Sequence, residues 1–288
     1  MKVETAGDLA RLRDILHGMG SALLAFSGGV DSTLLLAVGL ETLGDMLVAV
    51  TACSPLYPVH VVARARELAG RLGVEHIVIE TDELSDDAFM ANSPERCYLC
   101  KRELYGRLSE IAESRRIACV IDGTQEDDEG DYRPGMRAAT EFGVRSPLLE
   151  AGIGKEHVRA LSRDLGLETW NLPAGPCLAS RIPYNRSITP DKLYAIEEGE
   201  KLLAELGIRE MRVRYTDNRT ARIEVPPSSI PLLLDARVRE RVVKGMKELG
   251  FLYVALDLEG YRSGSMNVAL EARELVEKAY FSRHFLII

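Results

Sequence analysis

The sequence predicts an α/β fold, a doubly wound parallel sheet, followed by a smaller C-terminal α+β domain. Apolar segments rich in β-branched residues recur through the first half of the chain, and helical segments separate them. Continuous apolar strands joined by helices are typical of a parallel sheet that is covered on both faces. The composition then changes near "PYNRSITP" (183–190). We therefore expect two domains, at 1–182 and 183–288.

The expected elements follow one another without an internal repeat. An amphipathic helix, "MKVETAGDLARLRDILHG", comes first. In the first domain we expect strands at 22–26, 46–52, 76–80 and 118–123, with helices that include 57–72 and 98–115. In the second we expect a helix at 190–206, strands at 211–215 and 220–225, a helix at 236–249 and a strand at 251–257. Three loops, "SGGVDS", "TACSP" and "DGTQEDD", follow expected strands, so they predict one shared crevice.

Composition narrows the functional classes. The chain has 288 residues, of which 46% are hydrophobic, and no apolar stretch long enough for a membrane span. We expect a cytoplasmic protein without a membrane partner. The net charge of -8 disfavours a large nucleic-acid footprint. Five cysteines without an export signal favour metal or redox chemistry over a disulfide framework.

The loop "SGGVDS" has the character of a phosphate site. A glycine-rich turn between a strand and a helix points backbone N–H groups at one place, where the helix N-terminus adds partial positive charge. The loop lacks the lysine of the GxxxxGKS/T pattern and the spacing of GxGxxG. The alternative is a simple turn in which Asp31 or Ser32 caps the helix.

In this position "SGGVDS" resembles the PP-loop of the ATP pyrophosphatases, the superfamily of NAD synthase, GMP synthetase and several tRNA thiolases. Further stretches resemble the LarE family, sulfur transferases that build the nickel-pincer nucleotide cofactor of lactate racemase. They are "DGTQEDDEGDYRPGMRAATEFGVRSPL" (122–148), "PCLASRIPYNRSIT" (176–189), "RVRYTDNRTARIEVP" (212–226) and "DLEGYRSGSMN" (257–267). The resemblance covers nearly the whole chain.

The resemblance implies an ATP site. Its phosphate-binding residues are Ser27, Gly28, Gly29, Asp31 and Ser32, and Thr51, Ala52, Gly123 and Thr124 lie near the rest of the nucleotide. Asp31, also a catalytic candidate, would hold Mg²⁺ together with Asp127 or Asp128, and we favour Asp128. The alternative for the acidic run "EDDEGD" (126–131) is a solvated loop.

Three cysteines are candidate ligands. Cys97 and Cys100 form a CxxC in "RCYLCK", and Cys177 lies far along the chain. One LarE branch uses the cysteine at the position of Cys177 as a sacrificial sulfur donor, which makes Cys177 a catalytic candidate. A branch with three cysteines holds a [4Fe-4S] cluster whose fourth iron binds sulfide, and the CxxC resembles this branch. Zinc, a disulfide and unpaired thiols are the alternatives. Cys119 is expected in the core, and Cys53 stays unassigned.

The second domain carries the residues that the resemblance assigns to substrate. Arg181, Arg212 and Arg214 match positions that bind phosphate or carboxylate, for which guanidinium groups are suited. Glu200 and Glu224 match acidic positions near substrate or metal at a subunit interface, so we expect a homo-oligomer. Surface arginines and solvated glutamates are the alternatives. The stretch from Arg214 to Glu224 is one residue longer than the expected pattern, which leaves its register open.

The resemblance implies an ATP-dependent enzyme. It adenylates a carboxylate of pyridinium-3,5-biscarboxylic acid mononucleotide, a small nucleotide partner, and sulfide then replaces AMP to leave a thiocarboxylate. Two other classes remain open. A tRNA thiolase shares the PP-loop and three cysteines, but the net charge disfavours it. An ammonia-using ligase of the NAD synthase type leaves the three cysteines without a role.

Overall fold

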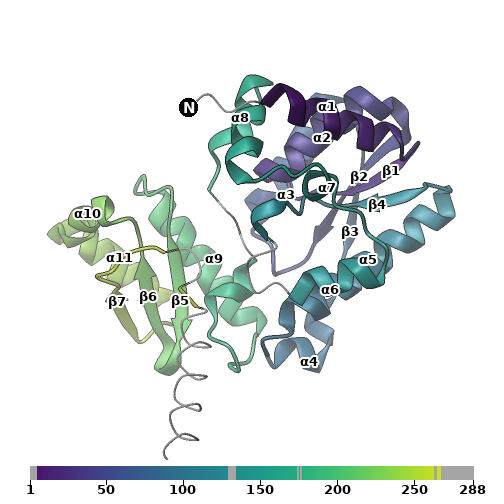
Figure 1. Ribbon diagram of the computed structural model, residues 1–288. Coiled ribbons are helices and arrows are strands. Elements are labelled where there is room, and N and C mark those ends of the chain that lie inside the picture. The colour runs from purple at the N-terminus through teal and green to yellow at the C-terminus, as the bar shows by residue number, and fades with distance from the viewer. Residues whose placement is uncertain (1–4, 129–133, 174, 176, 263–264, 267–288) are drawn as a thin grey trace, which may run out of the picture. The chain divides into compact units, whose positions relative to one another are not determined.

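The computed structural model describes residues 5–128, 134–173, 175, 177–262 and 265–266 (Figure 1). The chain divides into two units, Met1–Cys177 with Ser187–Thr189, and Leu178–Arg186 with Pro190–Ile288. The expected boundary after residue 182 falls within the stretch where the chain passes between the units, and it stays a prediction. No helix in the described part of the chain is long and apolar enough to cross a membrane.

The first unit is built on a parallel sheet, as predicted. Its strands are β1 (Ala22–Ala25), β2 (Leu47–Cys53), β3 (Glu75–Glu80) and β4 (Cys119–Ile121), in the order β3-β2-β1-β4. The observed strands start or end within about two residues of the expected bounds. The chain moves outward through β2 and β3 and then crosses to β4 on the other side of β1. The topological switch point, where such sheets bind ligands, therefore lies between β1 and β4.

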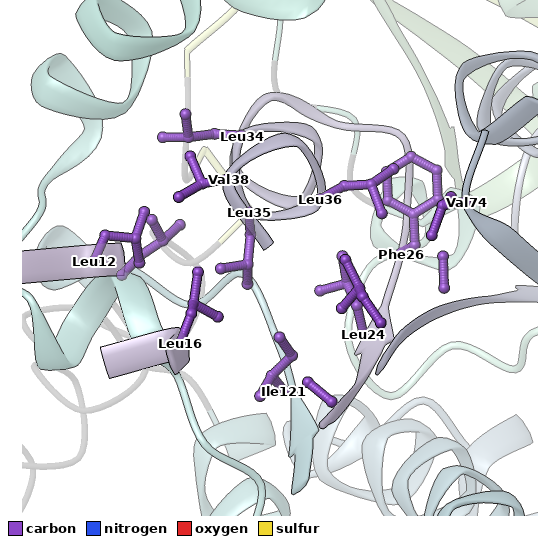
Figure 2. Packing of buried hydrophobic residues seen from close by; sticks show 14 of the residues in the cluster. Leu12, Leu16, Leu24, Phe26, Leu34, Leu35, Leu36, Val38, Val74 and Ile121 are labelled. Atoms are coloured by element: carbon purple, nitrogen blue, oxygen red, sulfur yellow. The ribbon is translucent and has the colours of Figure 1, made fainter. Parts of the chain in front are cut away.

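Helices cover both faces of this sheet (Figure 1). They are α1 (Thr5–His17), α2 (Val30–Leu43), α3 (Val59–Leu72), α4 (Asp87–Met90), α5 (Arg96–Arg115), α6 (Pro134–Glu141), α7 (Pro147–Glu150) and α8 (Lys155–Asp164). Leu24 packs with α1, α2 and α8 in one core, part of which Figure 2 shows, whereas Leu23 packs with α5 and α6 in a second. The two-residue period of a strand places these neighbours on opposite faces, which is why the strand is apolar throughout.

The second unit has its own sheet and core. It contains α9 (Pro190–Ala204), β5 (Arg212–Thr216), β6 (Thr220–Glu224), α10 (Ile230–Leu234), α11 (Ala236–Glu248) and β7 (Tyr253–Leu256). Strands β5 and β6 are antiparallel, and β7 lies parallel to β6. A separate apolar cluster that includes Val213, Met246 and Phe251 joins the sheet to its helices. This is the α+β arrangement that the sequence predicts for the C-terminal part.

Candidate active site

The loop between β1 and α2 forms the first part of the site. Ser27 accepts a hydrogen bond from the Gly29 amide (3.3 Å), and its hydroxyl lies 3.1 Å from that of Ser32. Helix α2 starts at Val30, directly after Gly29, and its first amides lack partners within the helix. Since the helix dipole is also positive at this end, the loop is suited to bind an anion.

Helix α3 fixes the shape of this loop. Gly28 has a φ of +68°, and a Cβ placed there would lie 3.2 Å from the Cα atom of Ala65. The neighbouring Arg64 donates a hydrogen bond from Nε to the Gly28 carbonyl oxygen (3.2 Å). The backbone of the loop is thus held close to α3 by a tight packing contact and a hydrogen bond.

The loop after β4 lies against the start of α2. A Cβ on Gly123 would approach the Ser32 amide nitrogen to 3.2 Å and the Asp31 Cβ to 3.4 Å, so a side chain there would require the start of α2 to shift by a few tenths of an ångström. Asp122 is buried and accepts hydrogen bonds from the Thr124 hydroxyl (2.9 Å) and the Tyr105 hydroxyl (2.6 Å). Gly123 therefore lies against the start of α2, and the roles of Gly123 and Thr124 in binding ATP stay predictions.

At the end of β2 the side chain of Thr51 is engaged within the fold, and the roles of Thr51 and Ala52 in binding the nucleotide stay predictions. The Thr51 hydroxyl is buried, donates to the Phe26 carbonyl oxygen (2.7 Å) and lies 2.8 Å from Nε2 of His76. Because its one proton goes to Phe26, Nε2 of His76 is the donor to Thr51. Ala52 follows and is half-buried.

The acidic candidates Asp31, Asp127 and Asp128 lie in different environments beside the glycine-rich loop. Burial raises the pKa of Asp31, and the nearby charge of Asp128 raises it further. Two carboxylates that destabilise each other's charge are stabilised by a shared cation. Asp127, in contrast, accepts a hydrogen bond from the Lys155 amide (2.6 Å) at the first residue of α8. Since Asp128 is buried, the solvated-loop alternative is wrong for this residue; residues 129–131 of the same run lie outside the described part.

The three candidate thiols lie in the first unit, where Cys177 is within electrostatic range of Cys97 and of Cys100. Cys97 and Cys100 share one face of the first turn of α5, as their i, i+3 spacing dictates. Burial raises the pKa of both thiols, and the nearby Cys177 thiol raises both further. Among the described residues, no three His, Cys, Asp or Glu side chains form a group that could hold a single metal ion. A [4Fe-4S] cluster takes each thiolate on a separate iron, so its thiolates need not meet at one point.

Two further side chains surround Cys100. The Tyr57 hydroxyl lies 3.7 Å from the sulfur, and the sulfur lies 3.7 Å from Oε1 of Glu83. Burial raises the pKa of Tyr57 well above its usual value, and Cys100 raises it further. Tyr57 follows β2 and Glu83 follows β3, so both belong to the carboxyl edge of the sheet.

In the second unit the predicted arginines and glutamates form one buried group. Arg181 makes a bidentate ion pair with Glu200 (2.9 and 3.0 Å), and Arg214 donates twice to Oε2 of Glu224 (2.9 and 2.7 Å). Arg212 stacks on the Tyr261 ring at 4.7 Å. The surface alternative is wrong for the three arginines and for Glu224, which are at most 5% exposed. The pKa of Arg212 is lowered by burial and by the charges of Arg181 and Arg214, so an anion would stabilise this group.

The pairing of β5 with β6 is regular in this segment, and its match to the family pattern stays a prediction. Arg212 pairs with Glu224 and Arg214 with Arg222 across β5 and β6, so all four side chains lie on one face of the sheet. The residues between the strands are Asp217–Arg219, of which Asn218 and Arg219 have positive φ angles. The register is therefore regular, and the diagonal neighbours Arg214 and Glu224 form the ion pair described above.

Comparisons with known proteins agree with this geometry. No protein-family model matches the chain. It is 42% identical, over 267 residues, to the pyridinium-3,5-bisthiocarboxylic acid mononucleotide synthase of Lactiplantibacillus plantarum, which covers 92% of this chain and 96% of that protein. The chain belongs to the LarE family.

Other relatives connect this LarE protein with a wider superfamily. It is 43% identical over 262 residues to an uncharacterized Synechocystis protein, with 91% of this chain and 97% of that protein covered. It is also 28% identical over 204 residues to a polypeptide of the glutamine-hydrolyzing GMP synthase of Thermoplasma acidophilum, a match that covers 65% of this LarE protein and 64% of its relative. The parallel sheet and its glycine-rich loop after β1 are those of the PP-loop superfamily, as predicted.

Sequence reasoning missed several residues that shape the candidate site. Arg64 and Asp122 shape the two loops at the switch point, and Tyr57 and Glu83 contact Cys100. One signal was available, because Tyr57, Glu83 and Asp122 all lie within a few residues of a strand's carboxyl end. Arg64 carries no such signal, since it lies inside a helix and its contact depends on packing.

Proposed function

We propose that this protein is an ATP-dependent sulfur transferase that converts a carboxylate of pyridinium-3,5-biscarboxylic acid mononucleotide into a thiocarboxylate. The observation that carries the proposal is the similarity to a synthase of the bisthiocarboxylic product, which extends over nearly the full length of both chains. The glycine-rich loop at the switch point supports the use of ATP, because it offers backbone donors and a helix N-terminus to a polyphosphate.

The first step activates the carboxylate. A carboxylate oxygen of the substrate attacks the α-phosphorus of ATP, the bond from that phosphorus to the bridging oxygen breaks, and pyrophosphate leaves. Ser27, Gly28 and Gly29 hold the pyrophosphate end, and Asp31 with Asp128 binds the Mg²⁺ that neutralises its charge. Gly123 and Thr124 keep the nucleotide beside the loop. A fixed geometry of this kind removes much of the entropic part of the barrier.

The second step transfers sulfur. Hydrosulfide attacks the activated carbonyl carbon, the carbon–oxygen bond to AMP breaks, and the thiocarboxylate and AMP leave. A [4Fe-4S] cluster bound by Cys97, Cys100 and Cys177 would supply sulfide from its iron without a protein thiolate. The donor set fits such a group, because three thiols lie within electrostatic range of one another and a buried carboxylate lies beside them. Without a cluster, burial keeps the Cys97 and Cys100 thiols protonated, because it raises their pKa values. Binding of the cluster would displace these protons.

The arginines of the second unit bind the substrate in this proposal. A mononucleotide with two carboxylates carries several negative charges, and guanidinium groups match both phosphate and carboxylate geometry. The charge of Arg212 is destabilised by burial and then by Arg181 and Arg214, so an anion beside Arg212 would stabilise it. We propose that the protein is a homo-oligomer in which Glu200 and Glu224 set the orientation of these arginines through their ion pairs.

The test is a reaction with purified components. The anaerobic protein is incubated with ATP, Mg²⁺, sulfide and the biscarboxylic acid mononucleotide, and the products are separated by chromatography and mass spectrometry. We expect AMP, pyrophosphate and a product in which sulfur has replaced oxygen. Formation of AMP and pyrophosphate without that substrate, or no AMP in its presence, would rule the proposal out.

A further inference from the structure

Glu83 is an anomaly in the first unit. Its side chain is 2% exposed, and its Oε1 atom accepts hydrogen bonds from Thr81 (3.1 Å) and from the Cys100 thiol (3.7 Å). The second oxygen, Oε2, is sealed from solvent and makes no hydrogen bond of good geometry in the described part of the chain, although the nearby Ser54 hydroxyl lowers the pKa that burial raises. A buried acceptor left without a partner destabilises the folded state, and more so when it is charged. Such an atom calls for an explanation, of which a missing ion is one.

The surroundings of Glu83 indicate which ion. The residue opens a short turn of 3-10 helix, Glu83–Ser85, directly after β3, and the Ser85 amide closes this turn on the Asp82 carbonyl oxygen. The Tyr57 hydroxyl contacts the same Cys100 sulfur. The carboxylate is therefore held against one of the three thiols of the proposed cluster site.

We propose that Glu83 is the fourth ligand of the cluster site, binding through its carboxylate the iron that the three cysteines leave open. This inference rests on the cluster of the proposed function. A carboxylate is a hard oxygen ligand, and soft sulfide displaces it readily from iron. Glu83 thus occupies the open position at rest and leaves it when hydrosulfide binds: one Fe–O bond breaks and one Fe–S bond forms, without change of oxidation state. A fourth cysteine would close the position permanently.

The alternative role of Glu83 is to accept the Cys100 hydrogen bond alone. The two roles differ in what they predict for the unique iron. A cluster that loses the ligand of one iron loses that iron more easily on oxidation and becomes a three-iron cluster, which has its own electron paramagnetic resonance signal. A hydrogen-bond acceptor of Cys100 changes the stability of the site but makes no bond to iron.

The experiment compares Glu83→Gln with Glu103→Gln in the anaerobically reconstituted full chain. Glu103 accepts a hydrogen bond from the Asp82 amide (2.9 Å) and lies near Glu83, but it contacts none of the thiols in the structure, so it controls for the loss of a neighbouring charge. After limited oxidation with ferricyanide, we expect Glu83→Gln to form the three-iron cluster several-fold faster than the wild type, and Glu103→Gln to match the wild type. Equal rates in all three proteins would overturn the assignment.

A measurement on the wild type guards against a variant that does not fold. The protein is produced with glutamate labelled at its carboxyl carbon with the magnetic carbon isotope, and the reduced cluster is studied by electron–nuclear double resonance. We expect a carbon coupling that sulfide abolishes, and its absence before sulfide is added would refute the ligand. A wild type without iron and acid-labile sulfide would remove the cluster and this ligand together, while the production of thiocarboxylate would still report separately on the proposed function.

Discussion

Gly28 occupies a backbone conformation that a residue with a side chain rarely adopts. Its φ of +68° and the 3.2 Å approach to Ala65 both oppose a Cβ. We expect Gly28→Ala to destabilise the fold by about 1–2 kcal/mol, the cost of the left-handed region, and to impair pyrophosphate release more than that loss explains, because the loop amides are displaced.

Urea unfolding and pyrophosphate release measured on the same preparations check this expectation. The matched control is Gly70→Ala, on the exposed side of α3, where a Cβ meets nothing within 4 Å. That change is expected to stabilise the fold by roughly 0.5–1 kcal/mol, since alanine is the better helix former. A Gly28→Ala protein as active and stable as the wild type would show that the loop does not need its observed conformation.

His76 makes the stability of the first unit depend on pH. Burial lowers its pKa, and the charge of Arg66 lowers it further. The folded state then binds the proton of His76 less tightly than the unfolded state does. The stabilisation that neutral His76 provides is therefore complete above a pH of about 6.5, and it is lost as the pH falls through the lowered pKa of His76 in the folded protein. We expect stability to fall on acidification in that window, and His76→Gln to reduce the slope of unfolding free energy against pH. An unchanged slope in the variant would assign the acid sensitivity to other groups.

At the scale of elements, the adjacent Asp127 and Asp128 are expected to have different roles: Asp127 caps a helix, and Asp128 binds Mg²⁺. Asp127 accepts a hydrogen bond from the amide of Lys155, the first residue of α8. The residue before α8 is Gly154, which has no side chain to cap the helix. Asp127→Ala should therefore cost about 1 kcal/mol of stability, as loss of a helix cap does, with little effect on catalysis. Asp128→Ala should leave α8 intact and raise the Mg²⁺ concentration required for AMP formation, because it removes the partner of Asp31. Thermal melts and Mg²⁺ titrations of both variants test this assignment. A stability loss in Asp128→Ala together with a higher Mg²⁺ requirement in Asp127→Ala would contradict it.

Elements differ in how far the sequence determines them. The strands of the sheet were predictable because each is an apolar run between helical segments, and the PP-loop because its residues are contiguous. The contact of Arg64 with Gly28 and the contacts of Cys100 with Tyr57 and Glu83 join segments distant in sequence, so they depend on packing that periodicity does not encode. The burial of Glu224 was equally hidden, since an acidic residue in a strand is exposed in most proteins.

At the scale of the whole molecule, charge separates the proposed substrate from tRNA. A tRNA-binding enzyme needs a basic platform for the phosphate backbone, and its affinity falls steeply with salt. This chain has a net charge of -8, and in the second unit the buried Arg181 and Arg214 are paired with Glu200 and Glu224. Such a compact group matches a small anion better than a polynucleotide, which favours the mononucleotide as substrate.

The mass of the whole chain after reaction distinguishes a catalyst from a reagent. If sulfide is delivered from the cluster, Cys177 survives, so the number of products per chain exceeds one and the intact mass stays unchanged. We expect this outcome in anaerobic reactions with excess sulfide, and we expect Cys97→Ala, Cys100→Ala and Cys177→Ala each to abolish both the iron–sulfur absorption and multiple turnover. Sacrificial use of Cys177 predicts the opposite: one product per chain, a mass lower by one hydrogen sulfide, and dehydroalanine at position 177. In that case Cys97 and Cys100 would tolerate substitution, and their proximity to Cys177 would have no part in sulfur transfer.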